Sequence, residues 1–415
     1  MIRVSDTPRA ERASGSGGGA LPLLLTLVIL FSLFRYLHGA ARLLAEAPFI
    51  DFAHYYTYTT VVARGLNPFD PHAVAQVDGV LGIRRAGAAA NYPPLFYLLM
   101  QPWVLLPFRP AAVAWFLASQ ACLVATLWLC LRRFASASPV MVTAALFVVL
   151  NYQPLIESLA LGQTNVLLLF LVALAWWGLR AGSPWVAAVA VAMALHIKVQ
   201  YSLLIPLLWA GGGHRVGNRA LLLGSLGVGA GLLLLGPTHY LDYLRYVLSL
   251  PDDLYTWTAN LSPRATLHRL FVTVPHGPVL ATGLTLALDA VLLLLFARAI
   301  AGSLRPGSAT ADWAWGLGLT AVPLLSPVTE EHHLVVLLLP LMLLLLAVPW
   351  ARMGPRDRIL LVGSVLLLGS RYSLEQFPAV HQGALSLLAT GKILGVGTLA
   401  WALIRRLRAG DGMEP

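Results

Sequence analysis

Charged residues are scarce in this 415-residue chain, where only 11% are Asp, Glu, Lys or Arg and 58% are hydrophobic. A soluble domain carries roughly a quarter of its residues as charges, so this composition excludes a soluble globular protein. The chain also lacks the short alternating segments of a transmembrane barrel. Its apolar residues instead form long runs rich in Leu, Ala and Val, which predicts an all-α polytopic membrane protein.

Cysteine and lysine are nearly absent, with two residues of each. Cys122 and Cys130 lie in one apolar run, where a disulfide between them would break the helix. Because the lysines are only Lys198 and Lys392, nearly all of the 28 basic residues are arginine. The arginines cluster in short loops beside apolar runs and belong to no nucleic-acid-binding motif, so we expect no nucleic-acid partner.

The apolar residues gather in about twelve segments that predict transmembrane helices. These are 20–37, 111–131, 139–152, 164–180, 184–197, 200–212, 220–236, 278–300, 312–327, 333–350, 358–370 and 384–404. Residues 92–108 are also apolar, but their four prolines favour an interfacial helix lying on the bilayer. With that assignment the arginine clusters share one side with the N-terminal tail, as the positive-inside rule requires.

These assignments predict a bundle of about twelve helices in the plasma membrane, with both termini in the cytoplasm. We expect a disordered cytoplasmic tail over 1–19, a single transmembrane domain over 20–404 and a second cytoplasmic tail over 405–415. The basic tail and first apolar run also fit a cleaved signal peptide, although an uncleaved helix is favoured. Long polar stretches then face the outside, namely a first external loop over 45–110 with interfacial helices and a second over 237–277.

Asp51 and Lys198 are the charged candidates for a site on the external face. Asp51 follows the first apolar helix, where a carboxylate is placed to take a proton from an acceptor hydroxyl. Its alternative role is that of a helix-capping or interface-anchoring acid. Lys198 ends an apolar segment, and an ammonium there indicates either an anion site or a side chain that snorkels to the surface.

Other polar residues recur at the starts of predicted helices and in external turns. They can bind sugar hydroxyls or a phosphate, or they can serve only as caps and turn residues. The candidates are Tyr55, Tyr92, Gln163, Asn165, Asn260, Ser262, Arg264, His332 and His333. Adjacent histidines diverge by about 100° on a helix, and Glu-Glu-His-His is not a zinc motif, so we expect no metal site.

These motifs and their order resemble those of glycosyltransferase family 87, whose members have the GT-C fold. The resemblance rests on Asp51-x-x-x-Tyr55, Gly65-x-Asn67-Pro68-Phe69-Asp70, Tyr92-Pro93-Pro94-Leu95, Gly162-Gln163-x-Asn165, Lys198, Asn260-x-Ser262 and Ser326-Pro327-x-Thr329-x-x-His332-His333. It implies a hexosyltransferase of the cell envelope that uses a polyprenyl-phosphate-linked sugar, with Asp51 as catalytic base. The chain departs from the family where no proline closely follows Lys198 and where Glu330-Glu331 precede the histidines, so mannosyl specificity does not carry over.

The resulting hypothesis is an inverting glycosyltransferase acting on the external face with no cofactor beyond its lipid-linked donor. Its partners would be membrane lipids, the polyprenyl-phosphate sugar and a lipid or glycan acceptor, with mannose as the first sugar to consider. Glu157 is the external acid that a retaining route would need as a second carboxylate. The alternatives are a transporter or lipid flippase, which would carry internal repeats and mid-membrane charges, and a membrane scaffold.

Overall fold

The computed structural model describes residues 20–46, 49–83, 85, 90–250, 253–301, 310–371, 374 and 376–410. Over these ranges the chain forms twenty α-helices and five 3₁₀ helices, and no strand occurs in them. The predicted all-α class is therefore confirmed. The expected tail over 1–19 lies outside the described residues. The C-terminal tail expected from 405 begins as helix, because α20 continues to Ala409.

Each apolar segment that the sequence predicts to be helical is helical. The corresponding elements are α1 (Ala20–Glu46), α6 (Phe108–Arg133), α7 (Pro139–Asn151), α9 (Asn165–Arg180), α10 (Pro184–Ile197), η1 (Val199–Leu204) with α11 (Ile205–Gly212), α12 (His214–Leu235), α16 (Gly277–Ile300), α17 (Ala311–Leu325), η2 (Glu331–Leu337) with α18 (Leu338–Ala347), α19 (Pro355–Gly369), and η5 (Ala384–Thr390) with α20 (Gly391–Ala409).

Length and composition identify five of the described helices as able to cross a membrane alone. A sixth span arises if α7 and α8 (Gln153–Leu161) count as one helix bent by 41°, with Pro154 in the first turn of α8. Four further apolar helices are shorter. The protein is thus a polytopic membrane protein, while the expected number of about twelve spans stays a prediction.

The expected external loops contain short helices rather than irregular chain. They are α2 (Ile50–Ala63), α3 (Pro71–Leu81), α4 (Pro94–Leu99), α5 (Gln101–Val104), α13 (Pro237–Leu248), α14 (Asp253–Thr256) and α15 (Pro263–Phe271); η3 (Trp350–Arg352) and η4 (Pro378–Val380) lie later in the chain. The single interfacial helix expected over 92–108 is instead divided, because the chain turns at Met100 and Pro102 begins a new helix. Asp70 caps α3 by accepting a hydrogen bond from the backbone N–H of His72.

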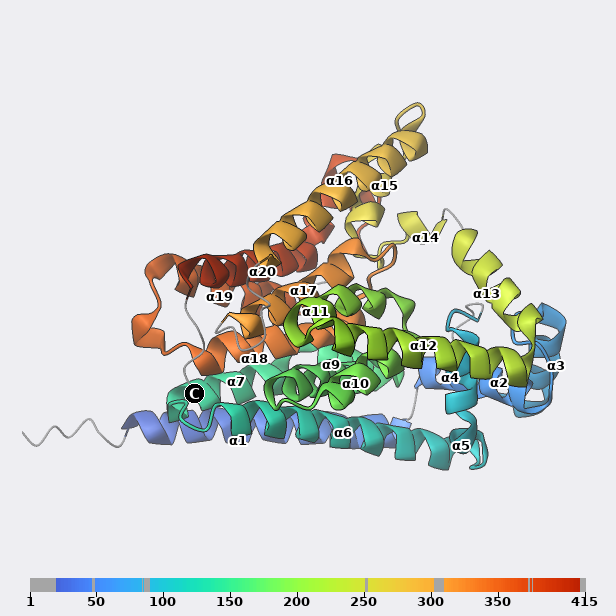
Figure 1. Ribbon diagram of the computed structural model, residues 1–415, viewed down its shortest axis with the longest axis horizontal. Coiled ribbons are helices and arrows are strands. Elements are labelled where there is room, and N and C mark those ends of the chain that lie inside the picture. Colours follow the sequence, from blue (N-terminus) through green and yellow to red (C-terminus); the bar gives the residue numbers. More distant parts are fainter. Residues whose placement is uncertain are drawn as a thin grey trace, which may run out of the picture.

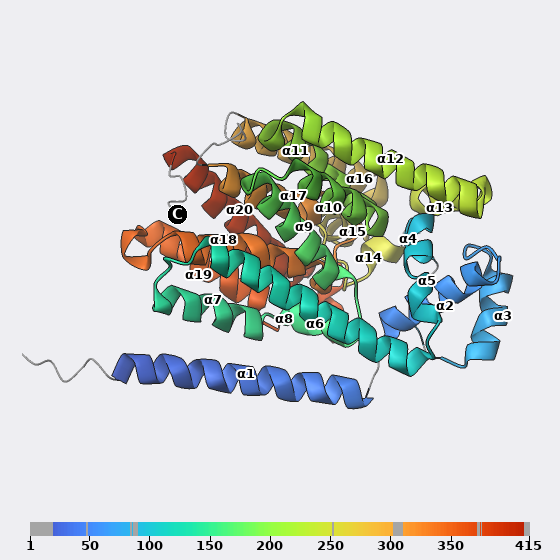
Figure 2. The ribbon, with the colours of Figure 1, turned by 60° about the horizontal axis from the view of Figure 1, so that its bottom comes forward.

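The long helices run roughly side by side, and the short helices α2 to α5 gather at one end of the bundle together with α13 (Figures 1 and 2). Helix α1 begins at the opposite end, and α20 finishes toward that same end (Figure 1). A chain that starts and finishes at one end of a bundle crosses it an even number of times. The residues that carry the chemistry lie where α2, the α8–α9 turn, the end of α10 and the start of η2 meet.

Candidate active site

Asp51 lies in the first turn of α2 and receives a hydrogen bond from Gln163 Nε2 to its Oδ2 at 2.7 Å. The other end of the Gln163 amide accepts hydrogen bonds from the hydroxyls of Tyr55 at 2.6 Å and Tyr92 at 3.3 Å. Because two hydroxyl donors occupy its oxygen, the amide must direct its nitrogen at Asp51. The carboxylate is thus held in one orientation, with its Oδ1 left for another partner.

Gly162 lets the α8–α9 turn come this close to α2. Its φ of 72° lies in the left-handed region, and a Cβ built there would lie 2.7 Å from the Cβ of Phe52. Only glycine satisfies both conditions without moving α2. The indole N–H of Trp115 donates to the Gly162 carbonyl at 2.8 Å and holds the turn in place. A backbone requirement therefore positions Gln163 against Asp51.

Lys198 follows the last residue of α10 and contributes the site's ammonium group. Its Nζ donates to Asn165 Oδ1 at 3.1 Å and lies 6.0 Å from the centre of the Tyr92 ring. Asn165 is itself buried at the start of α9. Burial lowers the pKa of Lys198 to about 8, although the carboxylates of Glu330 and Asp51 act in the opposite direction. The charge of this lysine therefore changes near physiological pH.

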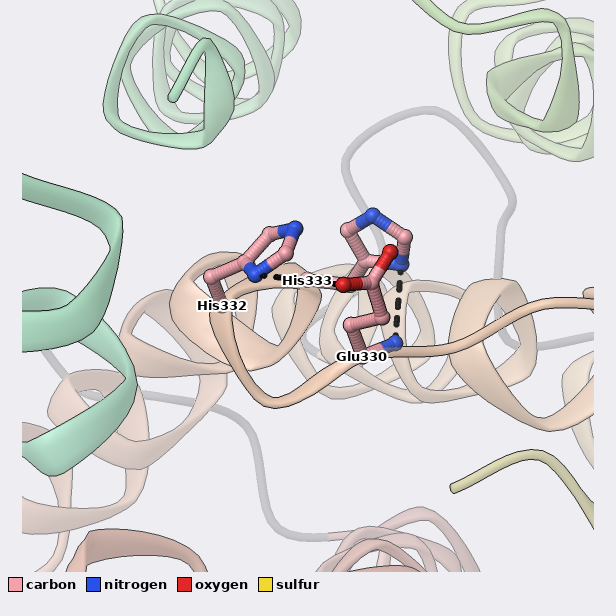
Figure 3. Close-up of side chains that lie close together, drawn as sticks. All are labelled: Glu330, His332 and His333. Carbon is pink, nitrogen blue, oxygen red and sulfur yellow. Dashed lines mark hydrogen bonds and ion pairs between the residues drawn. The ribbon is translucent and has the colours of Figure 1, made fainter. Parts of the chain in front are cut away.

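The predicted histidines lie at the start of η2, with Glu330 just before them. In Figure 3 the Glu330 carboxylate lies between the two imidazole rings, whose centroids are 4.6 Å apart. The backbone N–H of Glu330 donates to His333 Nδ1 at 3.1 Å. His332 Nδ1 lies 3.7 Å from Glu157 Oε1 and 3.9 Å from Glu330 Oε2. Two carboxylates thus face one buried imidazole.

Electrostatic interactions connect Asp51 with this group. Burial raises the pKa of Asp51 above its ordinary value, whereas His332, the hydrogen bond from Gln163 and Lys198 lower it. Burial also raises the pKa of Glu330, against the effects of His332 and Lys198. Carboxyl groups in such surroundings take up protons more readily than exposed ones, which suits a proton acceptor that must work near neutral pH.

Asn260 and Ser262 lie in a different environment, where the structure gives them hydrogen bonds within the protein. The Asn260 side chain donates to the carbonyls of Leu254 and Pro327 and accepts from the backbone N–H groups of Ser262 and Thr329. Ser262 caps α15 and donates to the Pro327 carbonyl at 3.0 Å. The two residues attach the 237–277 loop to the segment that leads into Glu330.

Arg264, the remaining predicted residue, lies over the ring of Tyr255 at 4.1 Å. The structure therefore brings together one set of predicted residues, and Asn260, Ser262 and Arg264 lie outside it. The assembled set is Asp51, Tyr55, Tyr92, Gln163, Asn165, Lys198, His332 and His333.

Two carboxylates in and beside the cluster, Glu330 and Glu331, were not among the site residues predicted from the sequence. Glu330 occupies the centre of the cluster, and Glu331 forms a 2.8 Å ion pair with Lys392, whose side chain is 1% exposed. Lys392 also donates to the carbonyls of Leu368 and Ser370. A lysine within an apolar segment requires a partner, so Lys392 was the available signal for Glu331. Nothing local to Glu330 distinguishes it from an ordinary turn acid.

The fold and this cluster define an integral-membrane protein with a polar, ionisable site at one end of a helix bundle. The family model of glycosyltransferase family 87 matches residues 91–327, which is more than half of the chain. The chain belongs to this family and is a membrane glycosyltransferase. The match includes Tyr92, Gln163, Asn165 and Lys198, while Asp51 and the two histidines lie beyond its ends. No curated protein matches the chain significantly.

Proposed function

We propose that the protein transfers a sugar from a polyprenyl-phosphate-linked donor to a lipid or glycan acceptor at the external membrane face, with Asp51 as general base. The observation that carries this proposal is the pairing of an oriented carboxylate with an ammonium group in one cluster. Gln163 holds Asp51, Asn165 holds Lys198, and each of the two charges affects the pKa of the other.

The proposed reaction is a single displacement with inversion. Asp51 takes the proton of the acceptor hydroxyl while the acceptor oxygen bonds to the anomeric carbon of the sugar. The bond from that carbon to the phosphate oxygen breaks, and the lipid phosphate leaves as an anion. Lys198 stabilises the negative charge that grows on the phosphate. No second carboxylate need act as nucleophile, since no covalent glycosyl intermediate forms.

An apolar cavity next to Lys198 supports a lipid-linked donor. Its volume is about 250 Å³, and its walls come from α4, α5, α6, α9 and α10. Phe96 stacks on Tyr92 with ring centroids 4.3 Å apart, and Ile197 directly precedes Lys198. A prenyl chain in this cavity would therefore bring its phosphate close to the ammonium group. The lining includes Phe96, Trp103, Trp115, Leu167, Met193 and Ile197.

A second cavity supports a polar, sugar-bearing acceptor. It measures about 470 Å³ and is lined by aromatic rings, two carboxylates and an arginine, among them Tyr58, Phe69, Asp78, Arg85, Asp242 and Tyr246. Tyr58 follows Asp51 and Tyr55 at spacings that share one face of a helix. The distance along α2 from Asp51 to Tyr58 is about 10 Å at 1.5 Å per residue. This separation suits an acceptor of several sugar units.

The decisive experiment compares purified wild-type protein with Asp51→Asn in transfer from radiolabelled polyprenyl-phosphate sugars to a membrane extract, beginning with mannose. The amide preserves size but cannot accept the proton, so we expect turnover to fall by about 10²–10⁴-fold. Asp70→Asn is the matched control, because Asp70 caps α3, and its turnover should stay near the wild-type value. A variant at Asp51 with more than about a third of wild-type turnover would remove this residue from the mechanism. Absence of transfer from every donor would favour a transporter or flippase.

The external placement is tested separately, by cysteine labelling in intact cells. A cysteine at Ala259, in the second external loop, should react with a membrane-impermeant maleimide added outside. A cysteine at Gly212, where α11 ends, should be protected. The reverse pattern would place the arginine-rich loops outside, against the positive-inside rule, and would contradict the proposed orientation.

A further inference from the structure

Glu330, His332 and His333 bring three metal-binding side chains together. One donor atom from each residue lies within 4.8 Å of the others. Figure 3 shows the carboxylate between the two rings, which stand at 85° to each other. The sequence predicted divergent histidines because it treated them as part of a regular α-helix. They instead open a 3₁₀ helix, and Glu330 reaches back from the turn that precedes it.

His332 is the residue that points to a ligand. Its side chain is 1% exposed, and neither ring nitrogen has a hydrogen-bond partner within the described part of the chain. The distances of 3.7 and 3.9 Å from its Nδ1 to the Glu157 and Glu330 oxygens are too long for hydrogen bonds. Two ligands of a tetrahedral metal with bonds of 2.0–2.1 Å lie about 3.4 Å apart. The atoms of the three residues lie within 4.8 Å of one another, somewhat farther apart than this, so metal binding would draw them closer together.

His333 has an unprotonated nitrogen in the same group, whose lone pair is engaged in a hydrogen bond. Its Nδ1 accepts the backbone N–H of Glu330, so this nitrogen carries no proton. Metal binding would exchange that hydrogen bond for a coordinate bond. Glu330 and His333 also form a capping box at the start of η2, which is a purely structural role. The capping box gives no reason for burying His332, with both of its nitrogens unpaired, beside two acids.

The charge balance also favours a cation. Among the residues that the structure describes, electrostatic interactions link four carboxylates to two ammonium groups across the site, namely Asp51, Glu157, Glu330 and Glu331 with Lys198 and Lys392. This excess of negative charge opposes the entry of a phosphate. A divalent ion would neutralise the excess and would add an electrophile where the leaving phosphate develops charge.

We propose that Glu330, His332 and His333, with Glu157 beside them, bind one divalent ion of the first-row transition metals. Two imidazole donors favour zinc and related ions such as cobalt and nickel over magnesium and calcium, which prefer oxygen ligands. The binding site stands on its own geometry. The use of the ion at a donor phosphate rests on the proposed transfer reaction.

The test titrates chelator-stripped, detergent-purified full-length protein with Co²⁺ and follows the visible absorption of the bound ion, without any donor. We expect saturation at one Co²⁺ per chain, displacement by Zn²⁺ and no competition from equimolar Mg²⁺. Glu330→Gln preserves the shape of the side chain and should weaken Co²⁺ binding at least tenfold, as should His332→Ala. The matched controls are Glu46→Gln and His72→Ala, both on exposed side chains away from the cluster, and both should bind like wild type.

Failure to saturate, or equal affinity in wild type and Glu330→Gln, would overturn the metal site and leave the capping box as the role of the cluster. Glu330→Gln preserves the size of the side chain and should fold like wild type. The comparison of wild type with Glu330→Gln therefore decides the question even if His332→Ala does not fold. Co²⁺ binding with no sugar transfer would instead contradict the proposed function and leave the metal site standing. Sugar transfer without Co²⁺ binding would contradict the metal site and leave the proposed function standing.

Discussion

Lys198→Arg provides the most discriminating prediction because it changes the pH dependence of the enzyme and not only its rate. The Lys198 ammonium has a pKa lowered to about 8 by burial, with Glu330 and Asp51 as the facing carboxylates. A guanidinium has a pKa above about 12 and stays protonated throughout the assay range. If the charge holds the donor phosphate, the wild-type enzyme loses it as pH rises through 8, and the arginine variant keeps it.

The expected magnitude follows from the fraction of lysine that is protonated. With a pKa of about 8, about half of the Lys198 side chains are charged at pH 8 and about a tenth at pH 9. We therefore expect wild-type kcat/KM for the donor to fall about fivefold between pH 8 and 9 and about tenfold between pH 9 and 10. Lys198→Arg should be less active at pH 7, since its larger fork fits the site differently, but its activity should stay level up to about pH 10.

Transfer rates at limiting donor concentration on detergent-purified protein, from pH 5 to 10, give the profiles. Lys198→Met, which removes the charge, should have low activity at every pH and serves as the control for side-chain length. The acid limb should be unchanged in Lys198→Arg if it reports Asp51, whose raised pKa reflects burial opposed by His332, Gln163 and Lys198 and reinforced by Glu157. An alkaline limb that persists unshifted in Lys198→Arg would show that another group titrates, and would refute the assignment.

Three further substitutions test neighbouring parts of the argument. Tyr55→Phe removes the 2.6 Å hydrogen bond to Gln163 and should lower kcat about tenfold in steady-state assays, and an unchanged kcat would dismiss the positioning role. Asn260→Ala removes four buried hydrogen bonds and should destabilise the protein by about 2–4 kcal/mol in thermal unfolding, whereas a wild-type melting curve would contradict the proposed loop attachment. Glu331→Gln leaves Lys392 buried without its carboxylate and should cost about 3–5 kcal/mol, with stability recovered in Glu331→Gln/Lys392→Met.

The fold follows from the sequence because the length of an apolar run and its flanking residues determine where a membrane helix begins and ends. The predicted segment 184–197 matches α10 residue for residue, with proline in its first turn. The interfacial helix expected over 92–108 is divided in two, with Pro102 in the first turn of the second part, α5. Helix boundaries can thus be predicted from the sequence where a residue such as proline restricts φ or lacks a backbone N–H donor.

The contacts between side chains of different helices cannot be predicted in this way. An almost uniformly apolar helix gives no indication of which face meets which neighbour, so its rotation and depth remain open. For this reason Lys392 had no assigned partner until the structure brought Glu331 to it from η2. Asn260 shows the same limit. Its amide could bind a sugar or hold a loop, and the sequence around it does not distinguish these two roles.

The position of the site at helix ends and turns suits the proposed reaction. In that reaction a prenyl chain would stay in the bilayer while the sugar and the acceptor hydroxyl meet ionised groups, and a charge deep in the bilayer would be costly in solvation free energy. Gln163, Lys198 and Glu330 all lie at or beside the ends of helices, where side chains from different helices face one another. A one-turn insertion in α10 should therefore separate Lys198 from Asp51 and abolish transfer while the bundle stays folded, whereas wild-type transfer by this variant would contradict the proposed pairing.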